Sequence, residues 1–277
     1  MNRALRDPIS VQRNVILILL LALAAAAWAS LIWQGSSAGS GMAMASPTMG
    51  FRAPLFLTIW VVMMVAMMFP AAAPMILTFH RVHESKRRRG EAFVSTWAFV
   101  AGYMLVWTLA GVAAYLGALA AERVSARFGL SSAAAARIGG VVLIAAGLYQ
   151  LTPLKDRCLA KCRTPISFIM TSWRDGVAGA LRMGFLHGVY CLGCCWLLFA
   201  ILFPLGIMNI FAMVAITVLV LAEKTLPWGR RAAGASAAAL VLYGAAVVFF
   251  PPALPTFVEP GGMAMPSETI PMDMRRR

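Results

Sequence analysis

Seven long apolar stretches constrain this chain more than any other feature of its sequence. They cover residues 15–33, 55–79, 93–119, 133–152, 180–203, 206–222 and 232–250. A helix needs about 20 predominantly apolar residues to cross a bilayer, and 61% of the 277 residues are hydrophobic while 12% are charged. Ala, Leu, Val and Gly without alternating polarity favour helices over a barrel. We therefore predict an all-α, polytopic transmembrane helical bundle of about seven spans, one domain over residues 15–250.

The net charge of +14 is concentrated in alternate connections. Basic residues precede the first apolar stretch and follow the second, fourth and sixth, so the positive-inside rule predicts a cytoplasmic segment 1–14 and an external, disordered, Met-rich tail 251–277. The charge then indicates topology and contact with the lipid bilayer, not a nucleic-acid partner. Ala27-Trp28-Ala29 also resembles a signal-peptide cleavage site, but the apolar run continues to Trp33, which favours an uncleaved anchor. The predicted location is the bacterial inner membrane.

One histidine and three cysteines lie on one face of the fifth stretch. His187, Cys191, Cys194 and Cys195 are spaced i, i+4, i+7 and i+8, which is a single helical face. A rise of about 1.5 Å per residue separates the first from the last by roughly 12 Å, so the four cannot share one ion. Cu(I), which two or three soft ligands satisfy, fits this ladder of incomplete sites better than four-coordinate zinc. Packing is the alternative, because free cysteine behaves as a small hydrophobe.

The second stretch carries paired methionines beside two prolines. The residues are Met63, Met64, Met67, Met68, Pro70 and Pro74. Prolines inside a helix bend it and free backbone carbonyls, as in helices that line transport sites; core methionines beside a structural kink are the alternative. Gly184 and Gly188 would let a neighbouring helix approach the cysteine face closely. We predict that this neighbour is the second stretch, which would bring methionine sulfurs to the thiols.

Eight further residues are candidate soft ligands outside the spans. They are Met42, Met44, Met263 and Met265 on the outer side, and His80, His83, Cys158 and Cys162 on the cytoplasmic side. The external methionines lie in Gly-, Pro- and Ser-rich sequence, where they either capture Cu(I) or reflect low complexity. The histidines are either a solvated membrane-edge pair or exit ligands. The two cysteines are either incidental or a cytoplasmic site whose basic neighbours lower the thiol pKa values.

Three motifs together resemble a known family. They are Met63-Met64-x-x-Met67-Met68-x-Pro70-x-x-x-Pro74, His187-x-x-x-Cys191-x-x-Cys194-Cys195-Trp196 and Glu223-Lys224. Over residues 55–250 the chain resembles a bacterial family of predicted metal-binding integral membrane proteins, described as copper-chaperone-like. The resemblance implies metal binding by the Met and His/Cys motifs. It also implies that Glu223 and Lys224 form an ion pair that closes the inner end of the site.

The expected function is Cu(I) binding and transfer, for copper import or for delivery to a cuproenzyme or a cytosolic acceptor. The chain lacks phosphate-binding and hydrolase motifs, so we do not expect an enzyme. The enzymatic alternative is a thiol-disulfide oxidoreductase that uses the Cys191–Cys194 CxxC. No other apolar stretch offers a resolving cysteine, which counts against it. A non-catalytic assembly subunit, and zinc or nickel as the ion, are the remaining alternatives.

Overall fold

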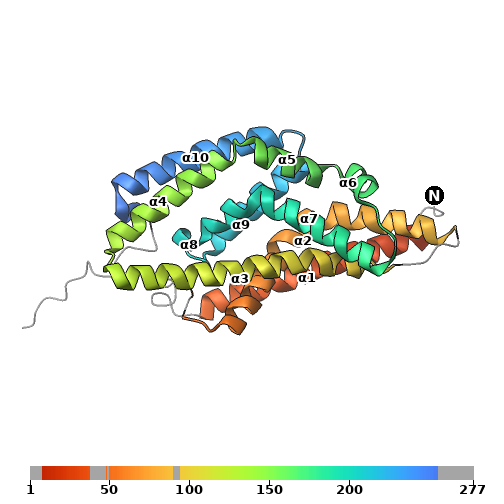
Figure 1. Ribbon diagram of the computed structural model, residues 1–277, viewed down its shortest axis with the longest axis horizontal. Helices are drawn as coiled ribbons and strands as arrows, with labels where there is room; N and C mark the ends of the chain where they lie inside the picture. Colours follow the sequence, from red (N-terminus) through yellow and green to blue (C-terminus); the bar gives the residue numbers. More distant parts are fainter. Residues whose placement is uncertain (1–7, 38–47, 49, 90–93, 255–277) are drawn as a thin grey trace, which may run out of the picture.

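The structure is a computed structural model that describes residues 8–37, 48, 50–89 and 94–254 (Figure 1). The described residues form ten α-helices and one short 3-10 helix, and they contain no strand. The first five helices are α1 (Pro8–Ser37), α2 (Ala53–Arg87), α3 (Thr96–Phe128), α4 (Ser132–Tyr149) and α5 (Pro153–Arg163). The others are α6 (Pro165–Ser172), α7 (Gly176–Ala200), α8 (Leu202–Leu205), α9 (Ile210–Thr225), α10 (Gly229–Phe249) and the 3-10 helix η2 (Pro251–Ala253). The predicted helical bundle is confirmed. The external candidates Met42, Met44, Met263 and Met265 lie outside the described residues.

Six of the described helices are long and apolar enough to cross a membrane. They are α1, α2, α3, α4, α7 together with α8, and α10. The remaining apolar stretch, expected over residues 206–222, folds as α9, which has 16 residues. Such a helix is about 24 Å long, less than the roughly 30 Å of a hydrocarbon core. The chain is therefore a helical membrane protein with six full-length candidate spans, and its orientation stays a prediction.

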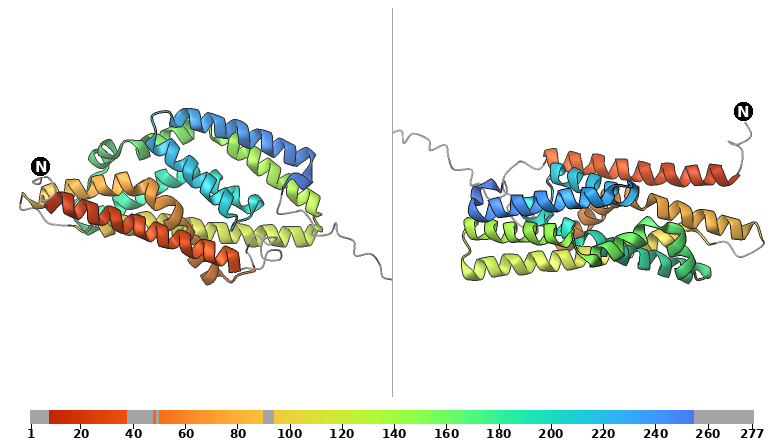
Figure 2. Two further views of the ribbon diagram at one scale, coloured as in Figure 1. Left: turned by 180° about the vertical axis from the view of Figure 1, so that it is seen from behind. Right: turned by 90° about the horizontal axis from the view of Figure 1, so that it is seen from above.

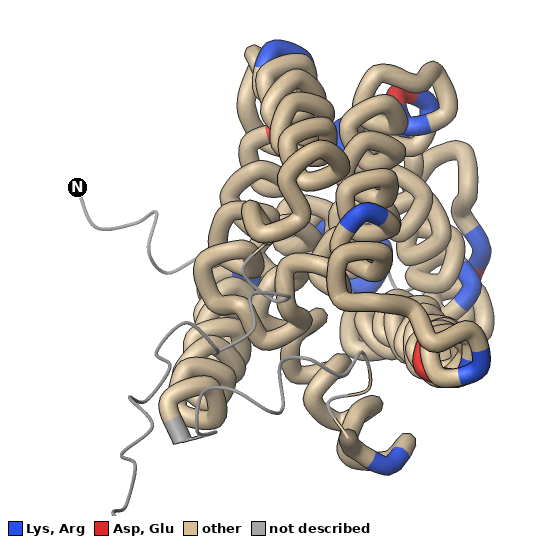
Figure 3. Tube along the Cα trace, turned by 90° about the vertical axis from the view of Figure 1, so that its left-hand side faces the viewer, with Lys and Arg blue, Asp and Glu red and all other residues tan. Residues whose placement is uncertain are grey.

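Large apolar side chains stay exposed along the outer faces of these helices. Leu116 on α3, Val218 on α9 and Leu242 on α10 are more than half exposed. A water-soluble monomer rarely leaves so much contiguous apolar surface uncovered, whereas lipid chains cover it at no cost. Figure 3 shows the complementary pattern: long uncharged stretches of helix, with charged residues at few places. Membrane residence therefore follows from the outer surface as well as from helix length.

The helices pack in three close pairs, α1 with α2, α3 with α7, and α4 with α10 (Figure 1, Figure 2). Helix α7 packs against α3 and α5 and also touches α4 and α9. Short polar caps position the helices around it: Ser131 caps α4, Thr152 caps α5 and Asn209 caps α9, each by accepting a hydrogen bond from a first-turn backbone N–H. Helix α7 is therefore enclosed by other helices along its polar face.

The glycine face of α7 packs against α3, so our prediction that α2 is its neighbour is wrong. A Cβ atom on Gly184 would overlap the carbonyl oxygen of Phe99, and one on Gly188 would lie 2.9 Å from Val106. Helix α3 contributes a glycine of its own, Gly102, whose missing side chain makes room for the backbone of Leu181. Helix α2 contains no glycine. Close approach is favoured by small residues on both helices, and Gly102 of α3 supplies one opposite the glycine face of α7.

Replacing Gly184 by Ala should therefore destabilise the protein strongly. The new methyl group would have to displace backbone atoms of Phe99, which cannot rotate away as a side chain can. Overpacking of this kind costs about 1–3 kcal/mol. Thermal unfolding of the detergent-purified protein should show a lower Tm for Gly184→Ala. Gly117→Ala is the matched control, because a Cβ on Gly117 of α3 meets nothing within 4 Å. Equal melting of the two variants would contradict the packing described here.

Helix α2 continues through both of its prolines. Pro70 has no N–H to donate to the carbonyl of Ala66, four residues earlier, so that carbonyl is left without its helical partner. The indole of Trp28 on α1 donates a hydrogen bond to it, with Nε1 and the oxygen 3.1 Å apart. A freed carbonyl is thus present, as predicted, but α1 already satisfies it, and it holds α1 against α2.

Candidate metal site

The four α7 candidates face the protein interior. His187, Cys191, Cys194 and Cys195 are each at most 2% exposed, although α7 also carries half-exposed residues such as Val189 and Trp196. Their i, i+4, i+7, i+8 spacing therefore does define one buried helical face, as the sequence predicts. All five cysteines of the chain are free thiols.

Cys191 is the residue on which the other polar groups converge. Its Sγ lies 3.0 Å from the Nζ of Lys224 on α9 and 3.2 Å from the hydroxyl oxygen of Tyr103 on α3. The thiols of Cys194 and Cys195 both donate to the backbone carbonyl of Cys191, at 3.0 and 2.8 Å. Three helices thus place polar groups around one sulfur atom.

Helix α5 adds a thiol that sequence reasoning placed elsewhere. Cys162 is buried, and its thiol lies close enough to those of Cys191 and Cys194 to interact with them electrostatically. Cys158, one turn earlier, lies beside the backbone of α7: a Cβ on Gly193 would be 2.9 Å from its Sγ. The two cysteines of α5 therefore do not form a separate cytoplasmic site. Burial raises the pKa of the Cys158 thiol, whereas we expected basic neighbours to lower it.

The described residues contain no group of three or more His, Cys, Asp and Glu side chains that could hold a metal ion. A four-coordinate zinc site is therefore not formed by them. Two neighbouring thiols are a different case, because a soft monovalent ion needs only two such ligands. Cys191 with Cys162 or Cys194 is the pair that fits this chemistry.

His187 lies one turn before Cys191 and makes only ring contacts. Its ring stacks on Phe99 and Tyr103, with centroids 5.9 and 5.5 Å apart, and meets the edge of Phe168 at 5.6 Å. Neither ring nitrogen has a hydrogen-bond partner. Buried polar atoms are satisfied in the great majority of cases, so the nitrogens of His187 are available to a ligand.

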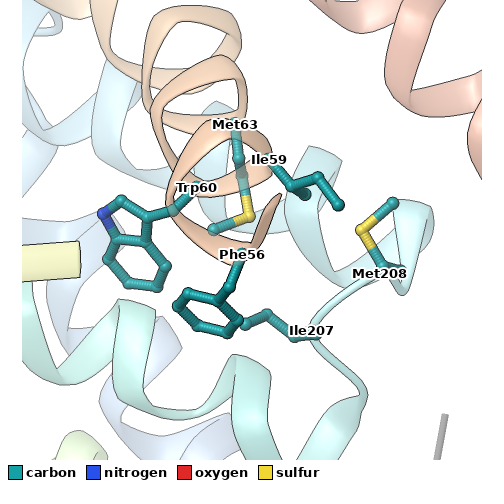
Figure 4. Close-up of a pocket in the computed structure, with 6 residues that line it drawn as sticks. All are labelled: Phe56, Ile59, Trp60, Met63, Ile207 and Met208. Carbon is teal, nitrogen blue, oxygen red and sulfur yellow. The ribbon is translucent and has the colours of Figure 1, made fainter. Parts of the chain in front are cut away.

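The methionines of α2 share the buried core with the cysteines. Met63, Met64, Met67 and Met68 are each at most 1% exposed. Met63 and Met208, from the connection after α8, line one small apolar pocket that also includes Phe56 and Trp60 (Figure 4). The pocket is too small to hold a water molecule. Direct approach of Met64, Met67 or Met68 to the thiols stays a prediction.

His80 and His83 are buried, so the solvated membrane-edge interpretation is wrong. They are 3% and 2% exposed. His80 Nδ1 lies 3.2 Å from the hydroxyl of Thr96, and the His83 ring packs between those of Phe79 and Trp173. The helical surface on which they lie is covered by the start of α3 and by the segment before α7. His80 also lines a cavity of about 280 Å³ between α1, α2 and the start of α3.

Glu223 and Lys224 do not form an ion pair with each other. Glu223 pairs with Lys155 of α5, with Oε2 and Nζ 2.7 Å apart, and accepts a hydrogen bond from Gln150. Lys224 reaches Cys191 instead. Adjacent residues on a helix point about 100° apart, so two neighbours in sequence serve two different clusters. The implied ion pair is wrong, but both residues are buried.

Comparison with protein families agrees with this geometry. A family model described as PpoB2, copper chaperone, matches residues 57–247. The chain belongs to this copper chaperone family. No curated protein and no solved structure matches the chain. The family range includes all five cysteines, all three histidines and Lys224. It excludes the external candidates Met42, Met44, Met263 and Met265. Family membership thus confirms the resemblance noted from the motifs, and it points to copper as the ion.

Proposed function

We propose that the protein is a copper chaperone of the bacterial inner membrane that carries Cu(I) as cargo and is not an enzyme. One observation carries the proposal: thiols from two helices, Cys162 of α5 and Cys194 of α7, are buried close to Cys191, whose Sγ lies 3.0 Å from the ammonium of Lys224. Thiolates are the protein ligands that Cu(I) prefers. Enclosure by α3, α5 and α9 keeps water away, so that bound Cu(I) is shielded from aqueous oxidants.

Ligand exchange would move the ion along the chain. In this proposal the external methionines collect Cu(I), the buried methionines of α2 receive it, and Cys191 with Cys162 or Cys194 holds it most tightly. Thiolates bind Cu(I) more strongly than thioethers, so the ion would move inward without an energy source. Its recipient would be a cuproenzyme under assembly or a cytosolic acceptor. Clustering of the α2 methionines and the buried cysteines in one core supports a continuous route.

Copper titration tests this proposal. The detergent-purified protein should bind Cu(I) under anaerobic conditions in competition with a chelator, and the Cys191/Cys194/Cys195→Ser triple variant should lose the tight site. The Met64/Met67/Met68→Leu variant is the control, since it removes thioethers from the route and leaves every thiol in place. A cysteine variant that binds Cu(I) as tightly as the wild type would refute the proposal.

Thiol-disulfide exchange is the second candidate, and the same geometry favours it. Sequence reasoning found no resolving cysteine, but Cys162 lies beside Cys191 and Cys194. Two such thiols could reduce a client disulfide and form a disulfide themselves, with two electrons and two protons passing to the client. Alkylation of the protein in intact cells discriminates the two functions. Thiols that are always reduced, and a Cys191→Ser variant that traps no mixed disulfide, would exclude this candidate.

A further inference from the structure

Lys224 is a buried cation without a carboxylate partner. The residue is 8% exposed, and no Asp or Glu of the described chain lies within ion-pair distance of its Nζ. The neighbouring carboxylate, Glu223, is turned towards Lys155. Lys224 donates a hydrogen bond to the sulfur of Cys191, 3.0 Å away. Cys194, Cys162 and Tyr103 are also within electrostatic range.

A buried charge requires an opposite charge close to it. Removing an ion from water costs several kcal/mol in real proteins unless a partner compensates. The groups around Lys224 are thiols and a phenol, which are anionic only when deprotonated or bound to a metal. The fold therefore keeps a fixed positive charge against the one sulfur on which the candidate ligands converge.

We propose that Lys224 selects a monovalent soft ion over a divalent one; this inference rests on the proposed function. Two thiolates and one Cu(I) carry a net charge of −1, which the ammonium neutralises. Two thiolates and one Zn(II) are neutral, so that the ammonium would be left as an uncompensated charge in a dry interior. Such a charge is costly there. The methionines of the route are neutral and cannot discriminate in this way.

The selection acts through charge and not through ligand type. Two thiolates, from Cys191 with Cys162 or Cys194, are also ligands that Zn(II) uses. Softness alone thus leaves zinc as a competitor, and a fixed cation beside the sulfurs excludes it. Ag(I), which has the charge and softness of Cu(I), should be accepted equally well.

Paired affinity measurements on two variants test this proposal. Lys224→Gln removes the charge, and Lys224→Arg keeps it; Met is avoided because a new thioether would itself bind Cu(I). Dissociation constants for Cu(I), Ag(I) and Zn(II) are measured by chelator competition on the full-length detergent-purified protein. In Lys224→Gln the Zn(II)-to-Cu(I) affinity ratio should rise by about 100-fold or more, whereas Lys224→Arg should keep the wild-type ratio.

The outcomes separate the two proposals. If the wild type binds Cu(I) and the ratio is unchanged in Lys224→Gln, the selectivity role of Lys224 is overturned and the chaperone function stands. A wild type that binds no Cu(I) overturns both. A cooperative thermal unfolding transition of Lys224→Gln, measured without metal, shows that the variant folds. Should Lys224→Gln not fold, Lys224→Leu gives the same comparison, because it also removes the charge and adds no ligand.

Discussion

Replacing Cys191 by Ser should lower the Cu(I) affinity more than any other single cysteine substitution, by more than about 100-fold. Substitutions in the outer shell of a metal site already cost about 10–100-fold, and Cys191 is the sulfur shared by both proposed ligand pairs, Cys191 with Cys162 and Cys191 with Cys194. Serine is close in shape, so packing against Tyr103 and Lys224 is largely kept. The loss should therefore appear in chelator-competition affinity, with little change in Tm.

Cys158→Ser is the matched control for this variant. Cys158 lies beside the backbone at Gly193 and is not hydrogen-bonded to Cys191. Its replacement should change the affinity by less than Cys162→Ser does, because Cys162 is the buried α5 thiol close to Cys191 and Cys194. The expected order of loss is Cys191, then Cys162, then Cys158. An affinity that falls equally in all three variants would show that the thiols act only through packing.

Local sequence patterns predicted the helices and the buried face of α7 correctly. A 20-residue apolar run has few alternatives to a spanning helix, and the i, i+4, i+7, i+8 spacing fixes which side chains share a face whatever packs against them. Both features depend on one segment at a time. The motif-based family resemblance was confirmed for the same reason, because each motif also lies within a single segment.

Contacts between helices were predicted less well. The motif argument placed α2 against α7, but α3 occupies that position. Gly102 on α3 and Gly184 on α7 allow the two helices to approach closely, and neither segment alone predicts that they meet. Helix α5, which carries Cys158 and Cys162, begins after its N-cap residue Thr152 and packs against α7. The local sequence of α5 does not predict which helix it packs against. Glu223 and Lys224 were paired because they are adjacent, although adjacent helical residues diverge.

The span count illustrates a different limit. Residues 206–222 are as apolar as the other stretches, yet Gly206 adopts a positive φ of 94° and α9 begins only at Ile210. The apolar residues before it pack in the connection after α8, where Met208 meets Met63. High hydropathy indicates that a segment is removed from water, and the segment can be covered either by lipid or by protein. A helix too short to span, buried on one face and apolar on its exposed face, therefore gives the same signal as a span.

Removing Glu223 should destabilise the protein by about 3–5 kcal/mol, because it leaves the ammonium of Lys155 buried and unpaired. The two side chains are 2% and 1% exposed, and Gln150 bonds to both of them. Glu223→Ala and Lys155→Met should each lower the Tm of the purified protein sharply. The double variant should recover much of the loss, since both charges are then gone. A double-mutant cycle measures that recovery.

A second ion pair between α5 and the C-terminal helices provides the control. Arg230 of α10 and Asp156 of α5 are 3.0 Å apart but 82% and 46% exposed, and pairs in water contribute about 1 kcal/mol or less. Arg230→Ala should therefore leave the Tm nearly unchanged. Because Glu223 precedes Lys224 in α9, loss of its pairing with Lys155 should also displace the ammonium from Cys191. Glu223→Ala should thus weaken Cu(I) binding, and Arg230→Ala should not. Similar melting and binding by the two variants would show that the buried pair neither stabilises α9 nor positions Lys224.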